Sequence, residues 1–262
     1  MQFDFGKNWL DFSRKALTAA KVTQAQTDFE KLFQGMDLTG KTFLDIGFGQ
    51  GLSLLIAKQK GSIVIGCDVN PKCQEALQQT ASLFSTGTNE IPVIIGSILD
   101  KAVLQQLKIN DNQQFDIVHS WGVLHHTGNM QYALQQAASL VKENGYLVIS
   151  IYNRHWTSPI WRIIKWLYCH SPSLLQKGLI YLFYPIIWLA KYLVTGKNPN
   201  KMTRGMDFLY NVVDWVGGYP YEYASIEEIE LLLNKQGLVM VKAIPSQVPT
   251  GCNEFVFNNT TL

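Results

Sequence analysis

Short apolar segments alternate with segments of helical periodicity over the first 150 residues, and this alternation restricts the fold more than any other feature. The apolar segments have the length of buried strands, and most are followed by apolar residues that recur every three or four positions. The expected strands are 42–46, 62–67, 92–96, 115–120 and 146–151, and the expected helices include 52–60, 70–84 and 129–142. Strands joined through helices pair in parallel, with helices on both faces of the sheet. The sequence therefore predicts an α/β fold.

The remaining segments extend this core. A capping-box pattern runs from Ser225 to Glu228 and predicts the start of another helix. Two further strands are expected at 238–244 and 254–257. We expect a helical N-terminal cap over 1–40, a core over 41–153, a helical insertion over 154–211 and the C-terminal part of the core over 212–262.

The expected insertion differs in charge from the rest of the chain. From Arg154 to Arg204 there are eight Lys or Arg residues and no Asp or Glu, which leaves 14 basic and 20 acidic residues elsewhere. An apolar helical face is expected over 156–168. The uncharged run 178–190 is shorter than the roughly 20 residues that cross a bilayer, and Pro185 interrupts it. We therefore favour a helical lid over the core, with peripheral contact of 154–204 with a membrane as the alternative.

The cysteines and the N-terminal residues suggest where the protein works. Four scattered cysteines form no C-x-x-C pair, so neither a zinc site nor a disulfide framework is expected. The first residues carry acids where a signal peptide has an apolar run. We expect a cytoplasmic protein, and the inner face of the membrane is the surface that a peripheral contact would use.

A glycine-rich turn follows the first expected strand. Gly47, Gly49 and Gly51 let the backbone turn sharply and approach a ligand, and the amides of the next helix point toward the same place. Leu52 stands where a dinucleotide-binding motif has its last glycine. Asp68 ends the second expected strand, where a carboxylate can accept hydrogen bonds from both hydroxyls of a ribose. A nucleoside-containing ligand is therefore expected at this end of the sheet.

The segments 43–51, 96–98 and 115–126, with Asp68, resemble the class I S-adenosylmethionine (SAM)-dependent methyltransferases. This resemblance covers nearly the whole chain. It implies a Rossmann-like fold with a seven-stranded, mostly parallel sheet, helices on both faces and a helical insertion. Within the family the chain is most similar to small-molecule methylases related to the ubiquinone-pathway O-methyltransferases.

The resemblance also implies which residues contact SAM. Asp45 corresponds to the acid that holds the amino group of the cofactor, and Asp68 to the acid that binds the ribose. Ser97 stands in the adenine-contacting turn, where Asp is commoner in the family. The expected cofactor-binding residues are Asp45, Gly47, Phe48, Gly49, Gln50, Gly51, Asp68, Val69, Ser97, Ile98, Ser120, Trp121 and His125.

Methyl transfer requires alignment of the acceptor, the methyl group and the leaving sulfur, and a base only where the acceptor loses a proton. His126 is the first choice for that base, because its ordinary pKa suits proton removal near neutrality. Tyr152 and Asn153 follow the fifth strand, and Asp214 and Glu222 lie in a segment expected to be a loop; a salt bridge from either acid to Arg204 is the structural alternative. The candidate catalytic residues are His126, Tyr152, Asn153, Asp214 and Glu222.

The sequence thus predicts an enzyme that moves a methyl group from SAM to a small or lipid-like acceptor, with O-methylation first. The turn after strand four lacks the Asn/Asp-Pro-Pro-aromatic pattern of many amino-methylating enzymes, so a nucleic-acid partner is not expected. The alternatives are a methyltransferase of RNA or protein, and a non-catalytic SAM-binding or membrane-associated module.

Overall fold

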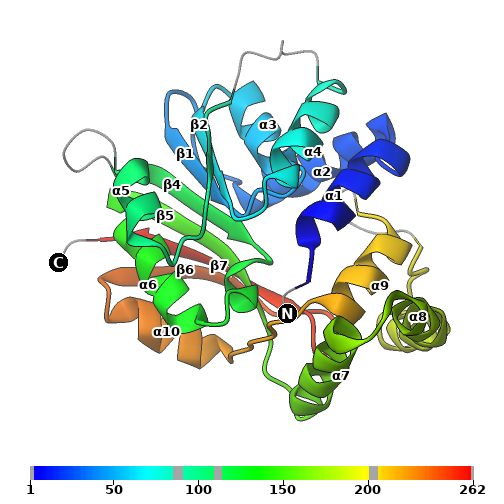
Figure 1. Ribbon diagram of the computed structural model, residues 1–262. Helices are drawn as coiled ribbons and strands as arrows, with labels where there is room; N and C mark the ends of the chain where they lie inside the picture. Colours follow the sequence, from blue (N-terminus) through cyan, green and yellow to red (C-terminus); the bar gives the residue numbers. More distant parts are fainter. Residues whose placement is uncertain (1–2, 85–90, 109–113, 201–205, 261–262) are drawn as a thin grey trace.

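The computed structural model describes residues 3–84, 91–108, 114–200 and 206–260, and its centre is a seven-stranded sheet (Figure 1). The strand order is β3-β2-β1-β4-β5-β7-β6. Strands β1 to β5 run parallel, and β7 runs antiparallel to both β5 and β6. The strands are β1 (Thr42–Ile46), β2 (Ile63–Asp68), β3 (Val93–Ile95), β4 (Phe115–Trp121), β5 (Val141–Tyr152), β6 (Leu238–Ile244) and β7 (Cys252–Asn259). The predicted mostly parallel α/β sheet is confirmed.

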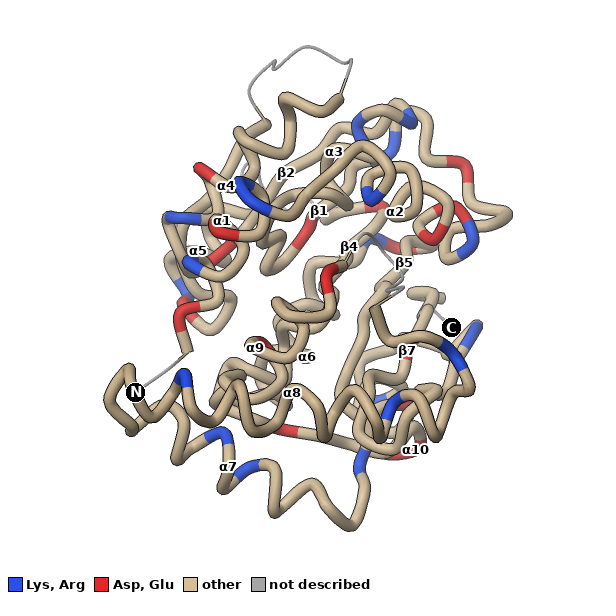
Figure 2. The backbone as a smooth tube through the Cα atoms, turned by 90° about the vertical axis from the view of Figure 1, so that its right-hand side faces the viewer, with Lys and Arg blue, Asp and Glu red and all other residues tan. Residues whose placement is uncertain are grey.

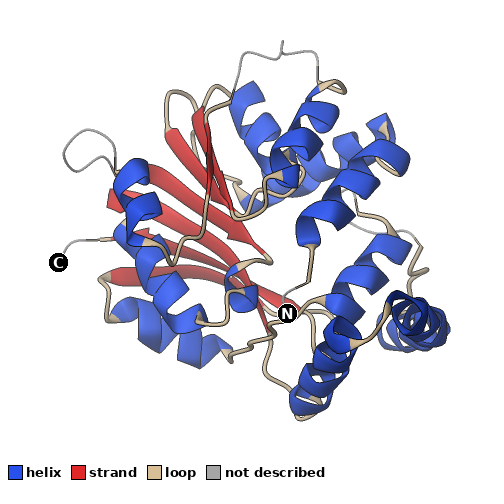
Figure 3. Ribbon diagram, viewed as in Figure 1, coloured by secondary structure: helices blue, strands red, loops and turns tan. Residues whose placement is uncertain are grey.

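Helices cover both faces of this sheet (Figure 3). One face packs against α5 (Lys101–Leu107), α6 (Met130–Ser139) and α10 (Ile226–Asn234). The other face packs against α2 (Ala19–Leu32), α3 (Leu52–Gln59) and α4 (Lys72–Ala81). A single 3-10 turn, η1 (Leu124–His126), follows β4. The capping box at Ser225 forms as expected, with Glu228 at the third helical position of α10.

The first helix, α1 (Phe5–Lys15), packs on α4 and α9 rather than on the sheet (Figure 1). The side chain of Asp4 caps it by accepting from the Lys7 amide at 2.9 Å. Asp4 also accepts from Asn70 Nδ2 at 2.8 Å, just beyond the end of β2. These contacts hold the N-terminal segment beside the carboxyl ends of the parallel strands.

The insertion consists of α7 (Ser158–His170), α8 (Ser173–Thr195) and α9 (Phe208–Gly217), which share a small apolar core. Helix α9 crosses the predicted segment boundary at residue 211. It also corrects one expectation: Asp214 lies within a helix rather than in a loop. Asp207, the residue before α9, caps the helix because its side chain accepts from the Leu209 amide.

Helix α8 corrects a second expectation, that Pro185 interrupts the apolar run. The helix runs through Pro185, has 23 residues in all, and is capped after Thr195 by Gly196, which adopts a left-handed conformation. A proline removes one helical hydrogen bond, but Leu189, Ala190 and Lys191 further along favour a helix and the helix continues. By length and composition α8 could cross a membrane, and its most apolar window has no buried residue.

Candidate active site

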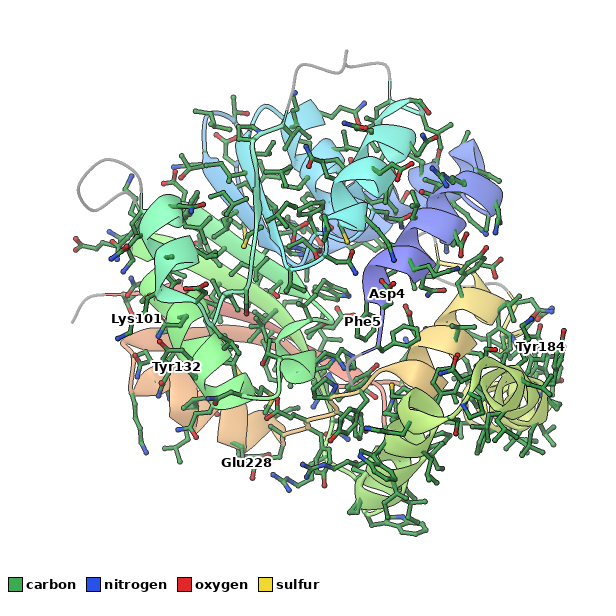
Figure 4. The ribbon with its side chains drawn as sticks, viewed as in Figure 1. Asp4, Phe5, Lys101, Tyr132, Tyr184 and Glu228 are labelled. Atoms are coloured by element: carbon green, nitrogen blue, oxygen red, sulfur yellow. The ribbon has the colours of Figure 1, made fainter. Side chains whose placement is uncertain are left out.

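A cavity of about 1170 Å³ lies at the carboxyl ends of the parallel strands, between the core and the insertion. Ligands of open α/β sheets bind at this end. Asp4 and Phe5, at the start of α1, stand at the same place (Figure 4) and line the cavity. Helices α8 and α9 supply the opposite wall through residues such as Ile187 and Asp214. The volume exceeds that of many single-ligand pockets and is large enough for a cofactor and an acceptor together.

The glycine turn after β1 forms one wall. Gly47, Gly49 and Gly51 have φ angles of 73°, 57° and 78°, a region that side-chain-bearing residues rarely adopt. A Cβ atom at Gly49 would lie 3.1 Å from the indole of Trp9. A Cβ atom at Gly51 would collide with Leu77 on α4. The turn is therefore held against α1 and α4 at a distance that only glycine permits.

Asp68, at the end of β2, fixes this turn and faces the cavity. Its Oδ2 accepts from the Gly49 amide at 3.1 Å, and its Oδ1 accepts from the Asn70 amide at 2.9 Å. Burial raises the pKa of the Asp68 carboxyl. The Cys73 thiol also donates to this carboxylate. A carboxylate has about four acceptor positions, so room remains for a hydroxyl donor of a ligand.

Asp45 is held by a residue that the sequence reasoning did not single out. His119 lies opposite Asp45 in the β1–β4 register, and its Nδ1 is 2.7 Å from Asp45 Oδ1. The His119 ring stacks on Trp121, with 5.7 Å between ring centroids and 9° between planes. Both partners of the buried pair line the cavity. The available signal was a polar residue near the carboxyl end of each of two neighbouring, largely apolar strands.

These residues fit SAM. The glycine turn offers space, and the Asp45 and Asp68 carboxylates offer acceptors for amine and hydroxyl donors. The Oε1 atom of Gln50 is buried and has no hydrogen-bond partner among the described residues, so it too can accept from a ligand. Ser97 and Ile98 lie in the same wall, after β3.

His126 faces the cavity from η1. Its Nδ1 donates to the carbonyl oxygen of Pro220 at 2.6 Å, and the Phe5 ring packs on it with 4.7 Å between centroids. Burial, with a smaller contribution from the nearby charge of Lys165, lowers the pKa of His126 to about 3. The ring is therefore neutral near pH 7, and a group with so low a pKa is a weak proton acceptor.

Asp214, on α9, is better suited than His126 to accept a proton. Its Oδ1 accepts from Asn8 Nδ2 at 2.6 Å. Burial raises the pKa of Asp214 to about 7, against the lowering effects of the Asn8 hydrogen bond and the Lys165 charge. A carboxylate with a pKa near the working pH is suited to accept a proton.

Lys165, on α7, is fully buried and was not a candidate from the sequence. Its Nζ donates to the Trp215 carbonyl and lies 4.2 Å from the centroid of the Trp215 ring. The rings of Tyr221 and Tyr152 are 4.8 and 5.6 Å away. Aromatic faces stabilise such a cation, but burial still lowers the pKa of Lys165 to about 7.

A methyltransferase domain model matches residues 20–185, which is more than half of the chain. The ubiquinone biosynthesis O-methyltransferase of Glaesserella parasuis is 33% identical over 117 residues, 45% of this chain and 48% of that protein. That of Vibrio vulnificus is 26% identical over 161 residues, 62% of this chain and 64% of that protein. The chain belongs to the methyltransferase domain family. Its matches span only about half to two thirds of the length of these relatives.

Solved structures agree with this fold. A putative methyltransferase of Haloferax volcanii, in complex with the activator Trm112, has a TM-score of 0.57 at 13% identity and covers 100% of this chain and 99% of that one. The magnesium protoporphyrin IX methyltransferase of Synechocystis PCC 6803, with bound SAH, has a TM-score of 0.54 at 15% identity and covers 92% and 84%. The predictions of a class I methyltransferase, of its fold and of SAM as its cofactor are confirmed.

Most expected cofactor contacts of the methyltransferase lie together in the cavity wall. These are Asp45, Gly47, Phe48, Gly49, Gln50, Asp68, Val69, Ser97, Ile98 and Trp121. Three others do not line it. Gly51 faces α4 instead, Ser120 Oγ donates to the Ile46 carbonyl at 2.9 Å, and His125 is fully buried, with its Nδ1 3.3 Å from the Tyr152 amide.

The candidate catalytic residues also divide. His126, Tyr152 and Asp214 line the cavity of the methyltransferase. Asn153 does not: its Nδ2 donates to the Pro249 carbonyl, and its Oδ1 accepts from Asn253.

Glu222 has a structural role, because its carboxylate accepts from the Met130 amide at 3.0 and 3.2 Å and caps α6. Arg204, its expected partner, lies outside the described residues. Burial raises the pKa of the Tyr152 hydroxyl well above its usual range, so Tyr152 keeps its proton near neutral pH and is not suited to act as a base.

Proposed function

We propose that this methyltransferase transfers the methyl group of SAM to a hydroxyl oxygen of a small or lipid-like acceptor. The observation that carries the proposal is the position of Asp214 in the same cavity as the glycine turn. A hydroxyl must lose its proton to become a good nucleophile, and a carboxyl with a pKa of about 7 accepts one near neutrality. The relatives named as ubiquinone biosynthesis O-methyltransferases favour the same acceptor atom.

When bound, SAM supplies an electrophilic methyl group on a sulfonium. Asp45, Asp68 and Gln50 are the residues that would hold it. The chain's own residues prepare the acceptor: Asp214 takes the hydroxyl proton on its carboxylate, while Asn8 fixes that carboxylate through Oδ1. Neutral His126, held in place by the hydrogen bond from its Nδ1 to the Pro220 carbonyl, lines the same cavity.

The walls of the cavity favour an aromatic or lipid-like acceptor. Phe5, Trp121, Tyr152, Trp161 and Trp215 all line it. Aromatic side chains offer large apolar faces with few polar groups, so they exclude water and bind flat, apolar ligands. The proposed place of work is the cytoplasm, in contact with the inner face of the membrane.

Transfer of labelled methyl from SAM into a cell extract tests the acceptor class. The extract is then separated into lipid, small-molecule and macromolecular fractions. Label in the lipid or small-molecule fraction, as an ether, is the expected result. Label in RNA or protein would replace the proposal with a polymer substrate, and tight SAM binding without any transfer would replace it with a non-catalytic binding module.

The substitution Asp214→Asn tests the proton acceptor. It keeps the shape of the side chain but cannot take a proton, so kcat is expected to fall by about 100-fold or more. SAM affinity, measured by calorimetry, is expected to change little. Glu222→Gln is the matched control, because that acid caps α6 outside the cavity and an amide oxygen still accepts from Met130. Full activity in Asp214→Asn would remove Asp214 from the mechanism.

A further inference from the structure

Helix α7 exposes several large apolar side chains on its outer side while its lysine is buried. Ile160 and Ile163 are 51% and 60% exposed, and Trp166 is 45% exposed. On the opposite side of the same helix, Lys165 is fully buried. A helix that faces water on its outer side has the reverse arrangement, with polar residues outward. The outer face of α7 is therefore made for an apolar environment.

Helix α8 continues this apolar surface. Its inner residues, such as Phe183 and Ile187, pack in the small core shared with α7 and α9. Its outer residues Leu182, Leu189 and Leu193 are 57%, 52% and 72% exposed. Such a set of exposed large apolar residues over two adjacent helices marks an interaction surface. We call the outer faces of α7 and α8 the docking face.

The charges around the docking face have one sign. The described residues 154–200 include Lys and Arg but no Asp or Glu. Arg162 lies on α7, and Lys177 and Lys197 lie near the two ends of α8; Figure 2 shows Lys and Arg positions in blue along the tube. Apolar and aromatic residues with a basic border match an anionic lipid surface, where acyl chains receive the apolar side chains and headgroups attract the cations.

The geometry distinguishes lying on a bilayer from crossing it. Although α8 is long enough to span, its inner side packs on α9, and Ile187, Ala190, Lys191 and Val194 line the cavity. A spanning helix would lose these contacts, whereas a helix in the interface keeps them and buries only its outer side. The same helix therefore separates the cavity from the docking face.

We propose that α7 and α8 dock the protein on an anionic bilayer, with both helices in the interface. The cavity wall formed by α8 is then next to the lipid, so that a lipophilic acceptor enters from the membrane rather than from water. The entry route rests on the proposed function, whereas the docking itself does not.

Co-sedimentation of the full chain with vesicles tests the docking. We expect binding to vesicles of phosphatidylcholine and phosphatidylglycerol to exceed binding to phosphatidylcholine alone by at least about tenfold at low salt, and to weaken as salt rises. The double substitution Leu182→Glu with Leu193→Glu is expected to lower vesicle binding by at least about tenfold. The matched control is Leu231→Glu with Val239→Glu, which alters residues that are 60% and 49% exposed on α10 and β6, outside the docking face.

Each outcome decides the proposal. Equal binding of both vesicle types, no binding, or equal loss in both double variants would overturn it. SAM titration of the docking-face variant, expected to match the wild type, shows that the cavity is intact. If vesicle binding behaves as expected but no methyl transfer is found, the proposed function fails and the docking stands. Methyl transfer into isolated membranes that survives in the docking-face variant would overturn the entry route.

Discussion

Asp68 accepts hydrogen bonds inside the protein from the amides of Gly49 and Asn70 and from the Cys73 thiol, and its carboxylate lines the cavity. Asp68→Asn replaces one carboxylate oxygen with an NH2 group, which donates. That group cannot accept a hydrogen bond from the Gly49 amide or from a ribose hydroxyl. We expect SAM affinity, measured by calorimetry, to fall by about tenfold or more. Asp116→Asn is the control, since Asp116 accepts from Thr42 at the far end of β1 and β4. Unchanged affinity in Asp68→Asn would show that Asp68 does not hold the cofactor.

Lys165 influences the pKa of Asp214, the proposed base. Its positive charge lowers the pKa of both Asp214 and His126. In Lys165→Met we therefore expect the acid limb of kcat/KM, set near pH 7 by Asp214, to move to higher pH by about one unit. An unshifted pH profile would show that Lys165 acts only in packing.

The same variant has a stability signature. Burial lowers the pKa of Lys165 to about 7 in the folded chain, so between about pH 7 and 10.5 the unfolded chain binds more protons and stability rises with pH. Lys165→Met should lack this rise and be more stable at pH 7, by ~1–4 kcal/mol. Denaturant unfolding at several pH values measures both effects.

Site residues that directly follow a strand could be predicted from the sequence. Site residues contributed by helices distant in the sequence could not. Gly49 and Asp68 follow strands, and parallel strand ends meet at one edge of the sheet. Asn8 and Lys165 come from α1 and α7, and no local pattern states that these helices meet Asp214. The expected loop around Asp214 was wrong because paired glycines at 217 and 218 suggested a loop, whereas they end α9.

At the scale of elements, the turn between β1 and α3 depends on its contact with α4. Gly51→Ala adds a methyl group that collides with Leu77. It also places an alanine at a φ of 78°, a conformation that residues with a side chain rarely adopt. We expect a loss of ~2–4 kcal/mol in the free energy of unfolding, measured in denaturant. Gly35→Ala is a matched control, because Gly35 has φ 86° but no atom within 4 Å of the added Cβ. Equal losses in the two variants would mean that the Leu77 contact costs nothing.

Helical periodicity predicted α7 but not which side faces the protein. The expected apolar stripe is present, but its residues Ile160 and Ile163 are exposed. An apolar stripe indicates that a helix face meets an apolar environment, but it does not tell whether that environment is the protein core or a lipid. Strand β5 begins five residues earlier than expected, at Val141. The sheet pairing of β4 and β5 shifts register between Phe115 and Ile117, and such irregularities follow from neighbouring strands rather than from local sequence.

At the scale of the whole molecule, the N-terminal segment joins the core to the insertion. The Phe3 amide donates to the Tyr219 carbonyl at 3.0 Å, and Asn8 donates to Asp214. In Asn8→Ala we expect hydrogen exchange in α1 and α9 to accelerate together by about tenfold, while β1 is unchanged. Asn129→Ala is the control: it removes the side chain that caps the start of α6 and should accelerate hydrogen exchange in α6 alone. Faster exchange in α1 without α9 would show that the two helices are not coupled.

The contact between Asn8 and Asp214 spans 206 positions of the chain, and β7, between β5 and β6, follows the other described strands in the sequence. During synthesis the residues of α1 therefore leave the ribosome long before α9 exists to receive them. In the order of translation, the residues of the glycine turn are made well before those of α9. A chain that stopped before α9 would therefore contain the proposed cofactor turn but lack Asp214, the proposed proton acceptor.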